Sequence, residues 1–465
     1  MRYVTLKKHY WLRGWRDREF ALYNWKAWSG EYGKALPLTR MQKEAIELLT
    51  RPGVSIDDPL LPQGMRQAGE KLLTLGFLEE RAPEADLAEE QKYRFADTLM
   101  SHSITWSITG DCNLRCRHCY ISCDENVYGE PTMAQCEEIV RQMKDANIHM
   151  VDLTGGEPLV RRDFWDLVDM LMDEKIYIEE IFSNGLLITD SFLDKLERRK
   201  IKLNSFLLSF DGVGRHDWMR GLHGAEEATI RTIKRLKSRG YGVIVTTVLH
   251  EQSMDCLMDT YQLMKDLDVD YWRVADVVNT GNWKKTQNTE VRASALLDAY
   301  VDLIGQMKRD GMPFRAVKLA GCFHASGDSY TLPALGGCGT KAQENEHLCE
   351  ASKLFPHLLP DGRLLPCMPM CGTEMEEHAP NILSGEYDIA KALIDSPLGK
   401  YMQYTYRDVF LHEEECRSCP HKYKCNRCPA TSLLYGSLFA KSPLTCAFIK
   451  RNYADRIRDV MDRAG

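Results

Sequence analysis

The chain has 465 residues and contains sixteen cysteines, an unusual number for a protein of this size. Apolar residues make up 44% and charged residues 27%, the balance of a soluble globular protein, which excludes collagen-like, disordered and coiled-coil chains. At roughly 150 residues per domain, the length predicts about three domains. The formal charge of −7 gives no electrostatic reason to expect nucleic acid or an anionic membrane as a partner.

The N-terminal residues and the cysteine content together indicate a compartment. The first twenty residues mix charged and aromatic side chains without an apolar core, so we do not expect a secretory signal peptide. No run approaches the roughly eighteen apolar residues of a membrane-spanning helix. We therefore expect a cytoplasmic protein whose cysteines bind metal or do redox chemistry rather than form disulfides.

Residues 1–90 are predicted to form a small winged-helix domain. The expected order is strand, turn, strand, helix, helix and strand-like wing, at residues 3–5, 13–14, 20–22, 41–49, 65–76 and 77–81. Thr39 is placed to cap the first of these helices. Residues 91–101 follow an acidic, Ala- and Glu-rich run and are predicted to be a linker.

Residues 102–320 alternate strand-like and helix-like segments, which is typical of parallel β/α units in an open sheet or a partial barrel. The six expected strands are SITWSIT, HMVDLT, IEEIFSN, SFLLSFD, VIVTTVL and YWRVADV. In such folds the chemistry gathers at the carboxyl ends of the strands. Residues 321–465 lose this periodicity and become rich in Cys, Gly and Pro, which predicts a region stapled by metal.

Three cysteines lie on one short loop directly after the first of these strands, at Cys112, Cys116 and Cys119. Three thiolates suit a cubane iron–sulfur cluster whose fourth iron keeps an open site for a small-molecule ligand. Zinc is the alternative, but it would need a fourth ligand, and His118 lies unfavourably between two of the cysteines.

The CxxxCxxC spacing at this position resembles the signature of radical S-adenosylmethionine (SAM) enzymes. That resemblance implies a partial (β/α)6 TIM barrel in which a GGEP motif approaches the amino group of the SAM methionine. Polar residues that end the third and fourth strands hold the ribose and methionyl groups, and an arginine pairs with the carboxylate. The implied SAM-binding residues are Tyr120, Gly155, Gly156, Glu157, Pro158, Ser183, Asn184, Ser209, Asp211 and Arg220. Taken singly, each motif also has a structural explanation, since Gly-Gly bends any chain.

By the same resemblance, a reduced [4Fe–4S] cluster on the three-cysteine loop donates an electron to SAM, and the resulting 5′-deoxyadenosyl radical abstracts a hydrogen atom from substrate. The electron would come from a donor such as flavodoxin or ferredoxin. The protein supplies orientation and exclusion of water. We expect the substrate cavity at the ends of the fifth and sixth strands, near Thr247, Arg273 and Asp276.

A second group of cysteines begins at Cys349 and Cys367 and continues with two CxxC pairs and a lone cysteine. A zinc ribbon would explain the pairs but not the others. The array resembles the SPASM domain, which carries two auxiliary [4Fe–4S] clusters in radical SAM enzymes. The resemblance implies a distal cluster on Cys416, Cys419, Cys425 and Cys446, and a proximal one on Cys349, Cys367 and Cys428.

The fourth ligand of the proximal cluster stays open in the sequence. Cys371 is the nearest candidate and Cys338 the next, while a vacant iron that meets the substrate is a third possibility. Ten assigned thiols leave six cysteines over. Cys136 and Cys256 fall in helical patterns and are expected in the core, whereas Cys123, Cys322, Cys338 and Cys371 fall in loops. A loop thiol could be a ligand or a hydrogen-atom donor, or have no role.

The front domain resembles the peptide-recognition element fused to maturases of ribosomally made peptides, which adds a leader peptide as a strand to its sheet. Its aromatic residues, Tyr3, Tyr10, Trp11, Trp15 and Tyr23, could line the adjoining groove or pack a core. The combined resemblance implies a radical SAM/SPASM maturase that binds a precursor peptide through its leader and forms a thioether from a Cys sulfur to an unactivated carbon. Carbon–carbon cross-linking, Cα epimerisation and an iron–sulfur redox-sensing winged-helix regulator are the alternatives.

Overall fold

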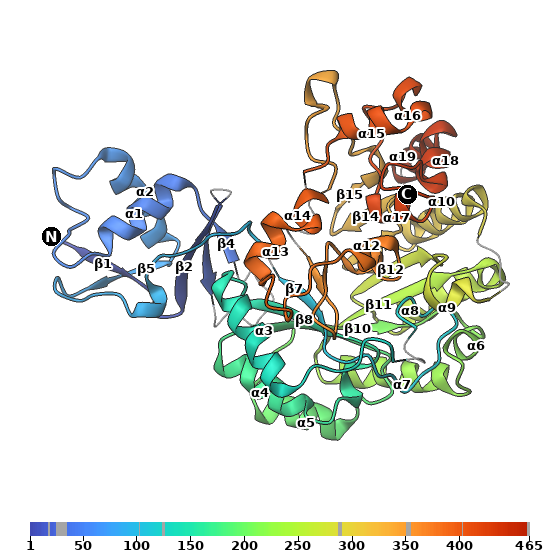
Figure 1. Ribbon diagram of the computed structural model, residues 1–465, viewed down its shortest axis with the longest axis horizontal. Helices are drawn as coiled ribbons and strands as arrows, with labels where there is room; N and C mark the ends of the chain where they lie inside the picture. The colour runs from blue at the N-terminus through green and yellow to red at the C-terminus, as the bar shows by residue number, and fades with distance from the viewer. Residues whose placement is uncertain are drawn as a thin grey trace.

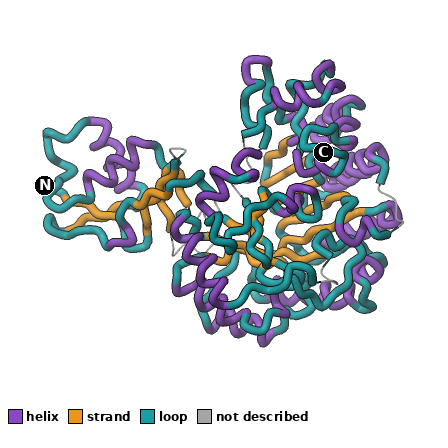
Figure 2. The backbone as a smooth tube through the Cα atoms, viewed as in Figure 1, coloured by secondary structure: helices purple, strands orange, loops and turns teal. Residues whose placement is uncertain are grey.

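The computed structural model describes residues 1–16, 19–24, 35–101, 103–122, 126–286, 291–349, 355–401 and 403–462. Three regions follow one another along the chain (Figure 1). The N-terminal region lies to one side, the α/β region occupies the centre, and the C-terminal region covers one end of the central sheet. Figure 2 shows that strands run through the first two regions, whereas short helices and loops dominate the third.

The N-terminal region contains two small sheets and two helices. Its elements are β1 (Tyr3–Leu6), β2 (Tyr10–Trp15), β3 (Phe20–Asn24), β4 (Ala35–Pro37), α1 (Arg40–Leu49), α2 (Gln63–Thr74), β5 (Leu78–Arg81) and β6 (Arg94–Ala96). β1 pairs antiparallel with β5, and the second sheet has the order β4-β3-β2-β6. Thr39 caps α1 through a reciprocal pair of hydrogen bonds with Gln42, as the sequence predicts.

Two predictions about this region are wrong. The expected turn at Arg13-Gly14 lies inside β2, where Arg13 pairs with Ala21 of β3 and Arg94 of β6. Gly14 reads as turn material, but here its missing Cβ makes room for the ring of Tyr93. The expected linker over residues 91–101 contains β6, which completes the second sheet. Pairing with a distant strand, rather than local propensity, decides both segments.

The aromatic residues of β2 and β3 form an interface with the central region. Trp15 is 1% exposed, packs with Met150 and Tyr177, and donates from Nε1 to the carbonyl of Ala146 at 3.1 Å. Trp11 and Tyr23 belong to the same buried cluster. Packing therefore accounts for these three aromatics, and they do not line a groove for a leader peptide.

The central region is built on the six expected strands, now with defined bounds. They are β7 (Ile104–Ser107), β8 (Met150–Thr154), β9 (Tyr177–Ser183), β10 (Ser205–Ser209), β11 (Gly242–Leu249) and β12 (Tyr271–Asp276). They are parallel and lie in chain order. The helices of this region are α3 (Met133–Asp145), α4 (Phe164–Asp173), α5 (Asp190–Arg198), α6 (His216–Arg220), α7 (Ala225–Ser238), α8 (Leu257–Asp266), α9 (Gly281–Lys284) and α10 (Ala293–Arg309).

Strands from later in the chain extend this sheet at both ends. β13 (Ala316–Leu319) adds parallel to β12, and β14 (Phe323–Ser326) and β15 (Ser329–Thr331) follow antiparallel, so this strand group crosses the boundary predicted near residue 320. β16 (His357–Leu358) adds parallel to β7 and pairs with β17 (Leu364–Leu365). The C-terminal region thereby contributes strands to the same sheet as the central region.

Short helices make up most of the remaining C-terminal region. They are α12 (Glu374–Glu377), α13 (Ile389–Asp395), α14 (Pro397–Tyr401), α15 (Tyr406–His412), α16 (Glu414–Ser418), α17 (Pro429–Leu433), α18 (Pro443–Lys450) and α19 (Tyr453–Asp462). The last two return to α10, where Tyr453 and Arg456 both contact Asp298.

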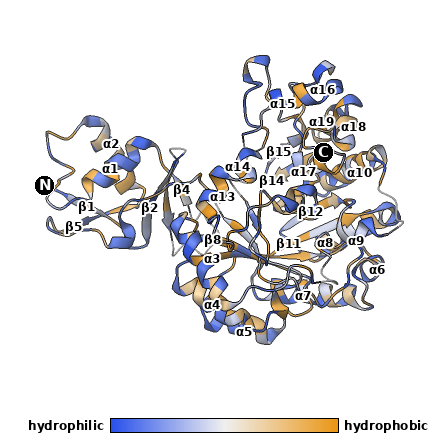
Figure 3. Cartoon of the chain, viewed as in Figure 1, coloured by the Kyte–Doolittle hydropathy of each residue, from blue (hydrophilic) through white to orange (hydrophobic). Residues whose placement is uncertain are grey.

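One large apolar core joins the central and C-terminal regions, and Figure 3 shows hydrophobic residues along the central strands. β7, β8 and most of β10 are buried along their length, as expected of parallel strands covered on both faces. In the described part of the chain, no helix has the length and apolar character needed to cross a membrane.

Candidate functional site

A cavity of about 520 Å³ opens at the carboxyl ends of the central strands. The three-cysteine loop after β7 forms one wall, and residues at or just after the ends of β8 to β13 form the others. The predicted site residues that line it are Cys112, Cys116, Cys119, Tyr120, Gly155, Gly156, Ser183, Asn184, Ser209, Arg220, Arg273, Asp276 and Cys371. The fold thus gathers side chains that are far apart in sequence at one edge of the sheet.

The three-cysteine loop is held from two sides. On one side the backbone NH of Arg117 donates to the carbonyl of Met219 at the end of α6. On the other, the NH of Asn282 donates to the carbonyl of Cys119 at 2.8 Å. The start of α9, which follows the sixth strand, therefore belongs to the site, although the sequence offered no motif to identify it.

Gly155 and Gly156 pack against the backbone that leads into the cysteine loop. A Cβ on Gly155 would lie 2.4 Å from the carbonyl oxygen of Thr109, and one on Gly156 would lie 2.2 Å from that of Asp111. Gly155 also has a φ of 153°, which disfavours other residues. Contact between the backbones of these two loops is therefore enough to require glycine at both positions, with or without a bound ligand.

Glu157 is fully buried behind the glycines rather than in the cavity wall. Its carboxylate accepts hydrogen bonds from Ser183 Oγ, at 3.0 and 3.1 Å, and from the backbone NH of Asn184 at 2.8 Å. Burial raises the pKa of Glu157 to about 7, although these donors act in the opposite direction. Pro158 begins the short 3₁₀ turn that follows and is also buried. The glutamate therefore ties the end of β9 to the end of β8.

Asp211 is buried and makes an ion pair with Arg220, whose Nε lies 2.8 Å from Asp211 Oδ2. His118 approaches the same carboxylate at 3.4 Å and His216 at 3.5 Å. Burial alone would raise the pKa of Asp211, but Arg220, His118 and His216 outweigh it and hold that pKa well below its usual range. Asp211 does not line the cavity; it supports residues that do.

Arg220 also reaches the cysteine loop, because its Nη1 group donates to Cys116 Sγ at 3.5 Å. Burial raises the pKa of the Cys116 thiol to about 11, and the nearby guanidinium partly counteracts this. A positive charge beside this sulfur favours its thiolate form. The arginine is thus placed both at the cavity wall and against one of the three thiols.

Thr247 was expected in the cavity wall but faces the opposite side of β11, where it is buried and accepts a hydrogen bond from Trp272 Nε1. Its neighbours Thr246 and Val248 line the cavity instead, because successive side chains of a strand point to opposite faces. Lys318, on β13 opposite Arg273 of β12, is a cavity residue that the sequence gave no reason to single out.

The proximal set of cysteines comes together in the C-terminal region. Burial, together with the neighbouring thiols of Cys428 and Cys349, raises the pKa of Cys367 well above its ordinary value. Burial, together with the same three thiols, raises the pKa of the nearby Tyr401 hydroxyl above its ordinary value. Three cysteines separated by up to 79 positions along the chain therefore lie near one another.

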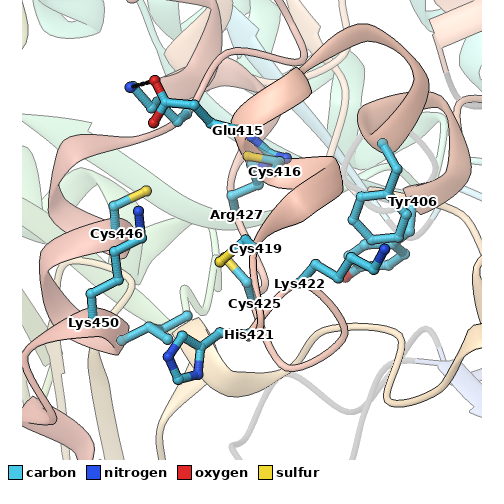
Figure 4. A pocket seen from close by; sticks show the side chains of 13 residues that line it. Tyr406, Glu415, Cys416, Cys419, His421, Lys422, Cys425, Arg427, Cys446 and Lys450 are labelled. Atoms are coloured by element: carbon cyan, nitrogen blue, oxygen red, sulfur yellow. Dashed lines mark hydrogen bonds and ion pairs between the residues drawn. The ribbon is translucent and has the colours of Figure 1, made fainter.

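The distal set shares a second, small cavity at the surface, lined by Cys416, Cys419, Cys425 and Cys446. Figure 4 shows the sulfur atoms of Cys416 and Cys446 directed into the space that the labelled residues enclose. Burial raises the pKa of Cys425 to about 12; Arg427 acts against this, while the other three thiols add to it. The structure therefore places these four cysteines around one cavity.

The remaining cysteines are mostly buried. Cys136, Cys256 and Cys322 pack in the interior, while Cys338 lies in a small cluster with Tyr406 and Phe410. Cys371 lines the large cavity. Burial raises its pKa well above the ordinary value, and the nearby carboxylate of Glu376 and, less strongly, the thiol of Cys367 add to this rise. Cys123 lies outside the described residues. None of the fifteen described cysteines forms a disulfide.

The donor atoms present fit iron–sulfur chemistry. Three thiols on one loop next to a large cavity leave room for an exogenous ligand, and soft thiolates are the ligands that such clusters take. Among the described residues, no three Cys, His, Asp or Glu side chains are arranged to chelate a single metal ion. His118 is bound to Asp211, so it is engaged away from the thiols.

Sequence comparison gives a family for the central region. The model of the Radical SAM superfamily matches residues 106–264. An AdoMet-dependent heme synthase from Oleidesulfovibrio alaskensis is 23% identical over 387 residues, covering 76% of this chain and 89% of that protein. The mycofactocin maturase MftC of Mycobacterium tuberculosis is 30% identical over 154 residues, or 32% of this chain and 38% of that protein. Other relatives, including a pre-heme d1 synthase, are matched over 46% to 51% of their length.

The fold resembles a solved structure over almost the whole chain. Streptococcus suis SuiB bound to its precursor peptide SuiA superposes with a TM-score of 0.67, at 17% identity, over 96% of this chain and 100% of that one. At this identity the likeness establishes the fold alone. The match of residues 106–264 to the superfamily model and the three-thiol cavity at the ends of the central strands lead to one conclusion: these residues form a radical SAM domain, of a superfamily that uses SAM and a [4Fe–4S] cluster.

Proposed function

We propose that this protein is a radical SAM maturase that modifies a ribosomally made precursor peptide, most specifically by joining a Cys sulfur to an unactivated carbon of another residue. The observation that carries the proposal is the combination of one continuous fold like that of SuiB, which was solved with a precursor peptide, and three separate groups of thiols within it. The MftC relative is also a maturase by name.

The cofactor site in this proposal uses the residues around the cavity. Cys112, Cys116 and Cys119 hold the cluster; Tyr120, the Gly155-Gly156 backbone, Ser183, Asn184 and Ser209 contact SAM, and Arg220 its carboxylate. When bound, the cluster and SAM together supply hydrogen-atom abstraction from an unactivated carbon. Glu157, Pro158 and Asp211 lie behind this wall and keep it in place.

The C-terminal region is proposed to be a SPASM domain over residues 321–465 with two further [4Fe–4S] clusters. Cys416, Cys419, Cys425 and Cys446 hold the distal cluster, and Cys349, Cys367 and Cys428 hold the proximal one. Of the candidates for a fourth proximal ligand, Cys371 is favoured over Cys338 because it interacts with Cys367. Its place in the large cavity would also bring that cluster close to the substrate.

Residues 1–90 are proposed to bind the leader of the precursor. Among the residues that the structure describes, β4 and β6 are the two outer strands of the four-stranded sheet, and an extended peptide could add to β4 through backbone hydrogen bonds. Trp15 fixes this region near Met150 and Tyr177, the first residues of β8 and β9, whereas the cavity lies at the other ends of these strands. The leader would therefore anchor the peptide at a distance from the chemistry.

A porphyrin-forming activity is the second candidate, because the heme synthase relative is matched over most of its length. The two functions are distinguished by their substrates, a porphyrin precursor or a peptide.

Under anoxic conditions with SAM and dithionite, the reconstituted protein should release 5′-deoxyadenosine. Co-expression with each short open reading frame beside its gene should give one peptide that loses two hydrogens and whose linked cysteine resists alkylation. A carbon–carbon link would lose two hydrogens but leave cysteine reactive; epimerisation would keep the mass and take up deuterium from heavy water.

Iron content tests the cluster assignment independently of the substrate. Three cubanes give about twelve irons per chain, and Cys425→Ala or Cys367→Ala should each reduce this by up to about four. Cys322→Ala is the matched control, since this buried thiol lies in neither auxiliary group. About four irons plus zinc in the unaltered protein would refute the auxiliary clusters. Absence of SAM cleavage at full iron content would refute the enzyme itself.

A further inference from the structure

The distal cysteine site lies in a strongly basic part of an acidic chain. Residues 416–451 contain four lysines, three arginines and no aspartate or glutamate, while the whole chain has a net charge of −7. The seven basic residues are Arg417, Lys422, Lys424, Arg427, Lys441, Lys450 and Arg451. The same segment contains all four distal cysteines, so the charge surrounds that site.

Most of this positive charge is exposed and lacks a close acidic partner. Lys441 pairs with Glu415, and both residues line the distal cavity, while Arg417 lies 3.7 Å from Glu414. Lys422, Lys424 and Lys450 make no ion pair with an acidic side chain in the part of the chain that the structure describes. Figure 4 shows Lys422, His421 and Lys450 around the mouth of the distal cavity.

Compensation of a bound cluster does not account for all of this charge. A cubane with four thiolate ligands carries a charge of about −2, since its core contributes about +2. Arg427 is suited to offset part of that charge, because it is only 8% exposed and contacts the thiols. Its guanidinium is fixed by the carbonyls of Phe439 and Ala440. The exposed lysines remain as a surplus that faces solvent.

An exposed apolar side chain adjoins this surface. Phe410 lines the distal cavity but is only 7% exposed, whereas the next residue, Leu411, is 61% exposed. Charged residues predominate in the solvent-accessible rim of protein interfaces. Basic side chains in the rim would speed encounter with an acidic partner through long-range attraction.

We propose that the basic surface of residues 416–451 is the docking site for a small acidic one-electron carrier protein of the flavodoxin or ferredoxin type. The inference rests on the proposed function, which requires a source of electrons, and it identifies where that source binds. In the transfer the reduced carrier would lose one electron, and the oxidised [4Fe–4S] cluster that the four distal thiols would hold would gain it, with no bond made or broken. A nucleic acid is the other polyanion that could bind here, but binding it would not require four thiols at the centre of the surface.

The test is binding of purified flavodoxin, and separately of a [2Fe–2S] ferredoxin, to the full-length protein reconstituted with its clusters. Biolayer interferometry should show a dissociation constant that rises steeply with ionic strength. The double variant Lys424→Glu/Lys450→Glu should weaken binding at least tenfold, and Lys424→Gln/Lys450→Gln should weaken it less. Lys234→Glu, an exposed charge reversal on α7, should leave the affinity unchanged. Cluster absorbance and circular dichroism report whether each variant is folded.

Two outcomes would overturn the proposal. One is that neither carrier binds, or that the charge reversals at Lys424 and Lys450 have no more effect than Lys234→Glu. The other is that a 20-base-pair DNA duplex binds more tightly than either carrier and displaces it, which would assign the surface to nucleic acid. If the glutamate variant does not fold, the glutamine variant decides. Because carrier binding is measured directly, failure of peptide modification would refute the proposed function without changing this result.

Discussion

Arg220 and Asp211 form a buried ion pair in which Nε and Oδ2 lie 2.8 Å apart, and the same guanidinium donates to Cys116 Sγ at 3.5 Å. Asp211 follows β10, while Arg220 ends α6. The carboxylate therefore holds the arginine in position between the cavity and the cysteine loop. Buried pairs of this kind are costly to break from one side, because the remaining charge is left without a partner.

Asp211→Asn should weaken SAM binding by roughly tenfold or more, because Arg220 would lose the charge that orients it. Isothermal titration of SAM into the reconstituted protein measures this. Asp255→Asn is the control, since it removes an exposed partner of Arg215 and should change the affinity little. Unaltered SAM affinity in Asp211→Asn would show that Arg220 does not depend on this pair.

Gly156→Ala should reduce iron loading of the SAM cluster. The new Cβ would lie 2.2 Å from the carbonyl oxygen of Asp111 and 3.0 Å from Cys112 Cβ, so the cysteine loop has to move. Iron analysis and absorbance near 400 nm should show about four irons fewer per chain. Gly321→Ala is a matched control, because its Cβ would meet nothing within 4 Å. Full loading of Gly156→Ala would mean that the loop tolerates the displacement.

Trp15→Ala should detach the N-terminal region from the central sheet. The indole is 1% exposed and bonds to Ala146, and truncating such a buried aromatic costs about 3–5 kcal/mol. Limited proteolysis should show faster cleavage between residues 96 and 104, and the first thermal transition should fall. Phe95→Ala, which removes a half-exposed ring from β6, should behave like the unaltered protein.

His357 should make the protein less stable as the pH falls. It is buried on β16, with Nε2 3.2 Å from Ser107 Oγ, and burial lowers its pKa to about 3. The unfolded chain takes up the proton near pH 6.5, so it binds more protons than the folded chain between about 6.5 and about 3. Stability is therefore lost progressively as the pH falls through that window, by a few kcal/mol at most.

Between pH 7.5 and pH 5, the melting temperature of His357→Gln should fall by less than that of the unaltered protein. Differential scanning fluorimetry at these two values measures the difference. The slope should not vanish, because burial also lowers the pKa of His149 and His216. An identical pH dependence of the variant would show that His357 does not contribute.

Local patterns in the sequence determined much of this protein. The six parallel strands, the capping of α1 by Thr39 and the grouping of Cys112, Cys116 and Cys119 on one loop all depend on neighbours within a few residues. Strand alternation and cysteine spacing express such short-range relations directly. The division of the later cysteines into two groups came from the family resemblance, carried over residue by residue, and not from local spacing alone.

Only the tertiary structure decided which partner each segment meets. Gly14 lies in a strand because β3 and β6 pair with β2 on either side, and Thr247 faces the core because of its register in β11. The sequence alone allowed Trp15 to be a binding residue, whereas its packing against Met150 and Tyr177 shows that it belongs to a buried cluster. Asp211 and Arg220 are a similar case. Each belongs to a motif that the sequence shows, but their ion pair joins the end of β10 to the end of α6, and a local pattern does not predict that contact. These contacts depend on how distant segments pack, and a local sequence window carries no information about that.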